Sequence, residues 1–145
     1  MVGGVRSVVV AIRIGMSPAR VWRALTVPSE VQAWSGVTPF DVLQGYPAAG
    51  QHARWFAQVG PVRLVLHDRV QAVDPTIRLA SSIAIGFVRI EEEYRLERHG
   101  PDCELVSVNE VRSSVPGLGR LAAWLTRSDV EASMQRLKDF CERPD

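Results

Sequence analysis

Residues 16–36 read MSPARVWRALTVPSEVQAWSG, and they predict two short helices in direct succession. Ser17 is a residue type favoured at a helix N-cap, and Pro18 suits the first helical position. The second helix is predicted over 28–34, and Gly36 ends it. The apolar residues of the first helix share one face, as expected for a helix that packs on a core: Val21, Trp22 and Leu25.

The segments on both sides of these helices predict strands. Residues 5–14 precede the helices and are rich in β-branched side chains, which pack well on a pleated surface. Six further strands are predicted over 38–43, 51–58, 62–73, 77–85, 88–98 and 104–112. Glycine and proline mark the breaks between them, and such short connections require antiparallel neighbours. The sequence therefore predicts a meander of seven strands.

The end of the chain changes to a helical period. Between Leu118 and Cys141 apolar residues recur every three or four positions, and charged residues fill the other face. The chain is thus predicted to be an α+β protein, with one antiparallel sheet and a long C-terminal helix. No repeat or linker interrupts it, so residues 1–145 are expected to form a single domain.

Composition narrows the function classes. The chain has 145 residues, 46% of them hydrophobic, and a formal net charge of +1. A length of this order can bury a core without disulfides or metals. The small net charge disfavours electrostatic capture of nucleic acid. Cys103 and Cys141 match no zinc or redox spacing and are predicted to be reduced, structural residues.

The sequence also bears on location. Arg6 and Arg13 interrupt the apolar N-terminal stretch, which lacks the order of a secretory signal. No apolar run approaches the ~18 residues of a membrane span. A cytoplasmic protein without an integral membrane segment is therefore expected. The oligomeric state is not readable from the sequence.

Two phrases resemble a known superfamily. Residues 17–26, SPARVWRALT, resemble the opening helix of START-like (SRPBCC) proteins, and Trp34 lies where their second helix carries a tryptophan. Residues 69–75, RVQAVDP, resemble the mid-sheet turn of that superfamily. The resemblance covers nearly the whole chain. It implies a helix-grip fold, in which a curved sheet wraps the last helix around a deep cavity. The superfamily spans lipid carriers, polyketide cyclases or aromatases, and hydrolase-like members.

The sequence carries no signature of a cofactor or of a catalytic nucleophile. It has no glycine-rich phosphate loop and no G-x-S-x-G motif. His52, His67 and His99 lie in different predicted elements, whereas a metal site needs three or four converging ligands. Neither a metal site nor a cofactor is therefore predicted.

One strand combines apolar and chemically active side chains on its inner face. In residues 88–98 one face carries Glu92 and Tyr94 among apolar residues, while the other face is charged throughout. Burial would raise the pKa of Glu92 and favour an acid that can donate a proton. Tyr94 would donate a hydrogen bond to a substrate oxygen. The alternative interpretation is structural, with Glu92 in an ion pair and Tyr94 in the core.

Other strands supply candidate ligand-binding residues. In 62–73 the more apolar face places Leu66 and Asp68 inward, unless a bulge reverses the strand. In 77–85 the inward set is predicted to be Ile77, Leu79, Ser81, Ile83 and Ile85. In 104–112 either Leu105, Ser107 and Asn109 or Val106, Val108 and Glu110 point inward. Further predicted contacts to the ligand are Trp55, Ile90, Leu121 and Leu125.

Two functions remain open at this point. The first is a protein that binds a lipid-like or polyketide-like molecule in an apolar cavity with a few polar groups. The second is a cyclase, aromatase or dehydratase that uses Glu92 and Tyr94 for acid–base chemistry in a dry pocket. Both predict a hydrophobic small molecule as the partner.

Overall fold

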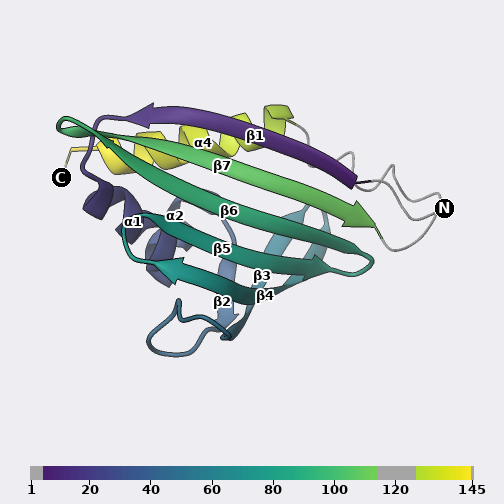
Figure 1. The fold of residues 1–145 in the computed structure, drawn as a ribbon. Helices are drawn as coiled ribbons and strands as arrows, with labels where there is room; N and C mark the ends of the chain where they lie inside the picture. Colours follow the sequence, from purple (N-terminus) through teal and green to yellow (C-terminus); the bar gives the residue numbers. More distant parts are fainter. Residues whose placement is uncertain (1–4, 114–126, 145) are drawn as a thin grey trace.

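A single antiparallel sheet dominates the computed structural model of the chain, which describes residues 5–113 and 127–144 (Figure 1). Its seven strands lie in the order β1-β7-β6-β5-β4-β3-β2. The first strand therefore pairs with the last, and the others follow the predicted meander. Their bounds are β1 Val5–Ile14, β2 Thr38–Asp41, β3 His52–Val59, β4 Val62–Asp74, β5 Arg78–Ile85, β6 Val88–His99 and β7 Asp102–Ser113.

Two short helices follow β1, as the sequence predicts. They are α1 (Pro18–Thr26) and α2 (Pro28–Ser35). The Ser17 hydroxyl accepts a hydrogen bond from the backbone N–H of Arg20 at 3.3 Å, so Ser17 is the N-cap of α1. The Trp34 indole N–H donates to the carbonyl oxygen of Ala24 at 2.7 Å. This buried bond fixes α2 against α1.

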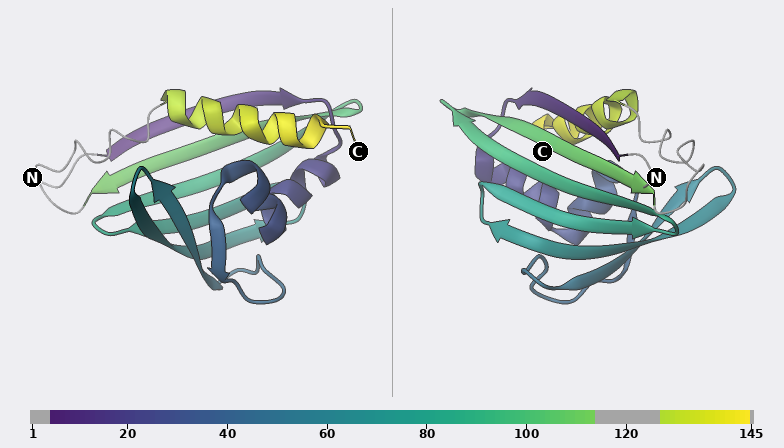
Figure 2. Two further views of the ribbon diagram at one scale, coloured as in Figure 1. Left: turned by 180° about the vertical axis from the view of Figure 1, so that it is seen from behind. Right: turned by 45° about the vertical axis from the view of Figure 1, so that its right-hand side comes forward.

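The C-terminal helix α4 (Arg127–Glu142) lies along β1 and beside α1 and α2 (Figure 2). Its buried face packs into the main core with Ile14 and Leu105, both fully buried. That face consists of Val130, Met134, Leu137 and Cys141. The Glu142 carboxylate also accepts a hydrogen bond from the backbone N–H of Gly15 at 2.6 Å, which ties the end of α4 to the end of β1.

The structure confirms the predicted α+β helix-grip fold, with local corrections. The helix predicted from 118 to 141 is described only from Arg127, so Leu121 and Leu125 lie outside the described residues. Ile77 was predicted to face inward but is 54% exposed, because the turn between β4 and β5 extends to it. Cys103 and Cys141 are buried free thiols, as predicted.

A bulge in β4 decides which residues of this strand face the core. Asp68 and Val70 are buried, but the register shifts between Val70 and Ala72. Val73 packs against the core after the bulge, although strict alternation from Asp68 and Val70 would place Ala72 there. For β7 the sequence left two possible inward faces. The inward face is the one with Leu105, Ser107 and Asn109, all of which are buried.

Candidate active site in the cavity

A cavity of about 230 Å³ lies between the sheet and the helices. Seven elements (α1, α2, β3, β4, β5, β6 and α4) contribute its walls, together with the segments before and after β2, so no single part of the sequence defines it. The described lining is mainly apolar and aromatic, with two carboxyl groups. It consists of Leu25, Val31, Trp34, Ser35, Val37, Tyr46, Trp55, Leu66, Asp68, Leu79, Ser81, Ile83, Glu92, Tyr94 and Ser133.

Asp68 is the most buried acid of this wall, with only 5% of its surface exposed. Its Oδ2 atom accepts hydrogen bonds from the Tyr46 hydroxyl at 2.6 Å and from the Trp55 indole N–H at 3.1 Å. Its Oδ1 atom is buried and has no hydrogen-bond partner of normal geometry among the described residues. Burial raises the pKa of Asp68, and hydrogen bonds from Tyr46, Trp55 and Ser81 oppose this rise.

Glu92 faces the same cavity from β6. Burial raises the pKa of Glu92 to about 7, and the nearby Asp68 carboxyl adds to this rise. A hydrogen bond from Tyr94 to Glu92 acts in the opposite direction. Glu92 is therefore poised to give or take a proton near neutral pH, which is the property required of a general acid or base.

Tyr94 and Tyr46 are held as neutral hydroxyls. Burial is the main cause that raises the pKa of each, and the neighbouring carboxyl groups add to it. Tyr94 is 8% exposed and belongs to the main core as well as to the cavity wall. Both tyrosines can thus donate hydrogen bonds at any physiological pH, but neither can act as a base there.

The structure brings most of the predicted site residues together. Eight of them line the cavity: Trp55, Leu66, Asp68, Leu79, Ser81, Ile83, Glu92 and Tyr94. Ile90 does not belong to its described lining. It packs instead against Val88 and Val111 in a small separate cluster. Leu121 and Leu125 are not among the described residues.

Sequence reasoning missed Tyr46, Trp34 and Ser133. Tyr46 lies between Gly45 and Pro47, in a segment that reads only as a turn, yet it binds Asp68 from 22 positions away. Trp34 is buried in the main core and also forms part of the cavity wall. An aromatic residue between two turn residues was the one available signal for Tyr46.

A second, smaller cavity of about 70 Å³ adjoins the first. Glu92, Tyr94 and Ser133 contribute to both, and Asp129 joins them from α4. Its floor includes Asn109, whose side-chain N–H donates to the Ser107 hydroxyl at 2.9 Å. The polar inner face of β7 thus continues the site toward α4.

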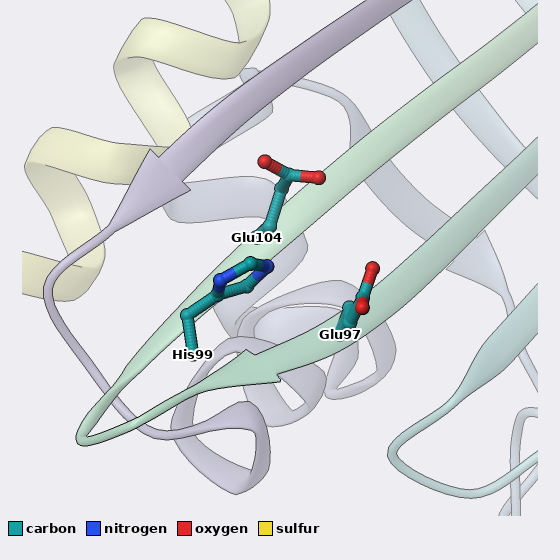
Figure 3. Close-up of side chains that lie close together, drawn as sticks. All are labelled: Glu97, His99 and Glu104. Atoms are coloured by element: carbon teal, nitrogen blue, oxygen red, sulfur yellow. The ribbon is translucent and has the colours of Figure 1, made fainter.

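A separate cluster of potential metal ligands lies on β6 and β7, away from the cavity lining (Figure 3). One ligand atom from each of Glu97, His99 and Glu104 lies within 4.8 Å of the other two. Histidine spacing alone could not reveal this cluster, because strand pairing places Glu97 opposite Glu104. Arg13 lies within hydrogen-bonding distance of His99 Nδ1, at 3.2 Å. This contact occupies Nδ1, whereas His99 Nε2 is buried and has no hydrogen-bond partner among the described residues.

Comparison with known proteins agrees with this architecture. The solved structure of protein MLL2253 from Mesorhizobium loti is 23% identical, with a TM-score of 0.76 over 97% of this chain and 99% of that chain. A protein from Arthrobacter aurescens is 10% identical, with a TM-score of 0.80 over 99% and 94% of the two chains. CalU16 from Micromonospora echinospora is 20% identical, with a TM-score of 0.70 over 97% and 78%. These likenesses establish the fold.

Sequence comparison adds the family. No curated protein sequence matches the chain. Among the described residues, no helix is both long enough and apolar enough to cross a membrane. The sequence profile of a family described as polyketide cyclase/dehydrase and lipid transport matches residues 5–142, almost the full length. The chain is therefore a member of the polyketide cyclase/dehydrase and lipid transport family, within the START-like (SRPBCC) superfamily.

Proposed function

We propose that this protein binds one apolar small molecule in the cavity between the sheet and the helices. The observation that supports this most is the lining itself, in which apolar and aromatic side chains surround a few polar groups. Such a composition is typical of small-molecule sites. The volume of about 230 Å³ lies below the ~300–1,000 Å³ typical of drug-sized ligands, which favours a molecule of one or two rings.

A pair of matched variants tests this proposal. Ser81 lines the cavity, whereas Ser82 is the next residue of β5, faces away and bonds Glu91 on the outer side. Ser81→Leu should fill the cavity and abolish binding of a neutral fluorescent naphthalene probe. Ser82→Leu should leave one probe bound per chain. If Ser81→Leu does not fold, Ile83→Phe can be used instead, because Ile83 also lines the cavity. Equal probe binding by the folded Ser81 or Ile83 variant and the Ser82 variant would contradict the proposal.

A catalytic role is the second candidate, and the pKa of about 7 at Glu92 favours it. On a poly-β-ketone, the Glu92 carboxylate would take a proton from the carbon between two carbonyl groups. The resulting enolate carbon would bond to a second carbonyl carbon, whose oxygen would take the proton back from Glu92 and become a hydroxyl. Glu92 would then pass the remaining proton of the former enolate carbon to this hydroxyl, which would leave as water while the carbon–carbon double bond forms. Tyr94 would donate to the carbonyl oxygen on which negative charge develops.

This second role has its own test. Incubation with a short poly-β-ketone thioester should give a cyclised product that has lost water, as detected by mass spectrometry. Tyr94→Phe should lower kcat by tenfold or more while leaving probe binding unchanged, because a donor to the developing charge acts in the transition state. Binding of the probe without formation of a cyclised product would contradict the catalytic role and support binding alone.

A further inference from the structure

We propose that the cavity selects an apolar molecule that carries an amine or another strong hydrogen-bond donor, and that it rejects carboxylates. This inference rests on the proposed binding function and specifies its ligand. Three independent features of the cavity wall support it: the charges it carries, the hydrogen-bonding groups it leaves unused, and the aromatic rings around them.

The charged groups that the described part of the chain contributes to the wall are all acidic. Asp68 from β4 and Glu92 from β6 line the main cavity, and Asp129 from α4 lines the adjoining one. No lysine, arginine or histidine belongs to the described lining of either cavity. A ligand carboxylate would place another negative charge beside two buried carboxyl groups in a region of low polarity. An ammonium group would instead gain a charge-assisted hydrogen bond.

Most hydrogen-bond donors among the described wall residues are already occupied. The Trp34 indole donates to Ala24, whereas the Trp55 indole and the Tyr46 hydroxyl both donate to Asp68. The Ser35 hydroxyl donates to the Val31 carbonyl, and Tyr94 donates to Glu92. The Ser81 hydroxyl also interacts with Asp68 and lowers the pKa of that carboxyl. The Ser133 hydroxyl accepts from the Arg136 guanidinium at 3.3 Å and can still donate. A ligand oxygen without a hydrogen therefore finds few donors.

An acceptor, by contrast, is left over. Asp68 Oδ1 is buried and lacks a hydrogen-bond partner of normal geometry among the described residues, although Asp68 is only 5% exposed. A buried acceptor without a partner is unfavourable, so a ligand N–H that reaches Oδ1 would stabilise the complex. The rings of Trp34, Tyr46, Trp55 and Tyr94 share the wall, and the face of an aromatic ring attracts a cation.

The same arrangement predicts how affinity depends on pH. The titratable groups around Glu92 are Asp68 from β4, Tyr94 on its own strand, Tyr46 from the segment between β2 and β3, and Asp129 from α4. Burial and Asp68 raise the pKa of Glu92 to about 7. As pH rises from 6 to 8 Glu92 loses its proton, so the attraction for an ammonium ion should increase. A neutral ligand should show no such gain.

Three ligands with one apolar body provide the test: 2-(2-naphthyl)ethylamine, 2-(2-naphthyl)ethanol and 2-naphthylacetate. Calorimetry at pH 8 should give the tightest binding for the amine, weaker binding for the alcohol, and a carboxylate at least tenfold weaker than the amine. Between pH 6 and 8 the amine should gain about tenfold and the alcohol should change little. Glu92→Gln should remove the gain, whereas Glu91→Gln, on the outer face, should retain it.

The outcomes separate this inference from the function on which it rests. Binding of the alcohol that equals or exceeds that of the amine, or tight binding of the carboxylate, would overturn the inference and leave the cavity as a ligand site. Failure of all three ligands and of the neutral probe to bind would overturn both. A pH-dependent gain for the amine that persists in Glu92→Gln would overturn the role given to Glu92.

Discussion

At the scale of single residues, the cavity holds two carboxyl groups that make each other's ionisation harder. Glu92 has a pKa of about 7, against 4.5 for an unperturbed glutamate, and Asp68 is one of the causes. Between these two values the folded protein holds a proton that the unfolded chain has lost. Stability therefore falls as pH rises through this range, by at most about 3 kcal/mol for Glu92.

Glu92→Gln removes this titration and should change the pH dependence of stability. The variant should lose less stability than the wild type between pH 5 and pH 8, and the difference should reach up to about 3 kcal/mol. Urea unfolding at several pH values measures it. Glu91→Gln should decline with pH as the wild type does. Parallel curves for Glu92→Gln and the wild type would mean that Glu92 has an ordinary pKa.

Tyr46→Phe removes the hydroxyl that donates to Asp68 at 2.6 Å. Loss of a hydrogen bond to an ionised group should destabilise the protein by about 1.5–3 kcal/mol above the pKa of Asp68, as measured by urea unfolding. In an Asp68→Asn background the same change should cost distinctly less, because the two residues interact. Equal costs in the two backgrounds would rule out this coupling.

The residues of the site differ in how far the sequence could reveal them. Glu92 and Tyr94 could be predicted to face inward because the opposite face of β6 is charged throughout. Asp68 could be placed on the inner face by alternation, since it precedes the bulge. The contacts of Tyr46 depend on how the segment between β2 and β3 folds back over the sheet. No periodic pattern encodes such a contact.

At the scale of elements, helix α4 should contribute strongly to stability through its buried face. Leu137 is fully buried in the main core, whereas Gln135 is exposed on the same helix. Leu137→Ala should cost about 2–5 kcal/mol, the range for a large side chain removed from a packed core. Gln135→Ala should stay within about 0.5 kcal/mol. Similar unfolding free energies for the two variants would contradict the packing of α4 described above.

Local sequence patterns predict the helices and strands, but not how distant elements pair or where a strand bulges. The N-cap Ser17, the two short helices and the seven strands follow from local signals, and the structure has them. The pairing of β1 with β7 joins residues about 100 positions apart and reflects closure of the whole sheet. The bulge in β4 and the exposure of Ile77 depend on how β4 and β5 meet, which alternation alone cannot specify.

At the scale of the molecule, the sheet and helices enclose a cavity whose described lining carries two carboxyl groups, Asp68 and Glu92, among apolar and aromatic side chains. The central claim is that one small apolar molecule occupies it. Trp34 and Trp55 belong to the cavity wall, whereas Trp22 packs elsewhere on the core and provides an internal control. The Trp55 indole N–H also bonds Asp68, so its proton resonance reports directly on this wall.

The most direct measurement is an NMR titration of the indole N–H resonances with the neutral 2-(2-naphthyl)ethanol. We expect the Trp55 and Trp34 resonances to shift and saturate at one ligand per chain, while the Trp22 resonance stays in place. Shifts confined to Trp22, or no saturable shift at Trp55 and Trp34, would contradict this claim.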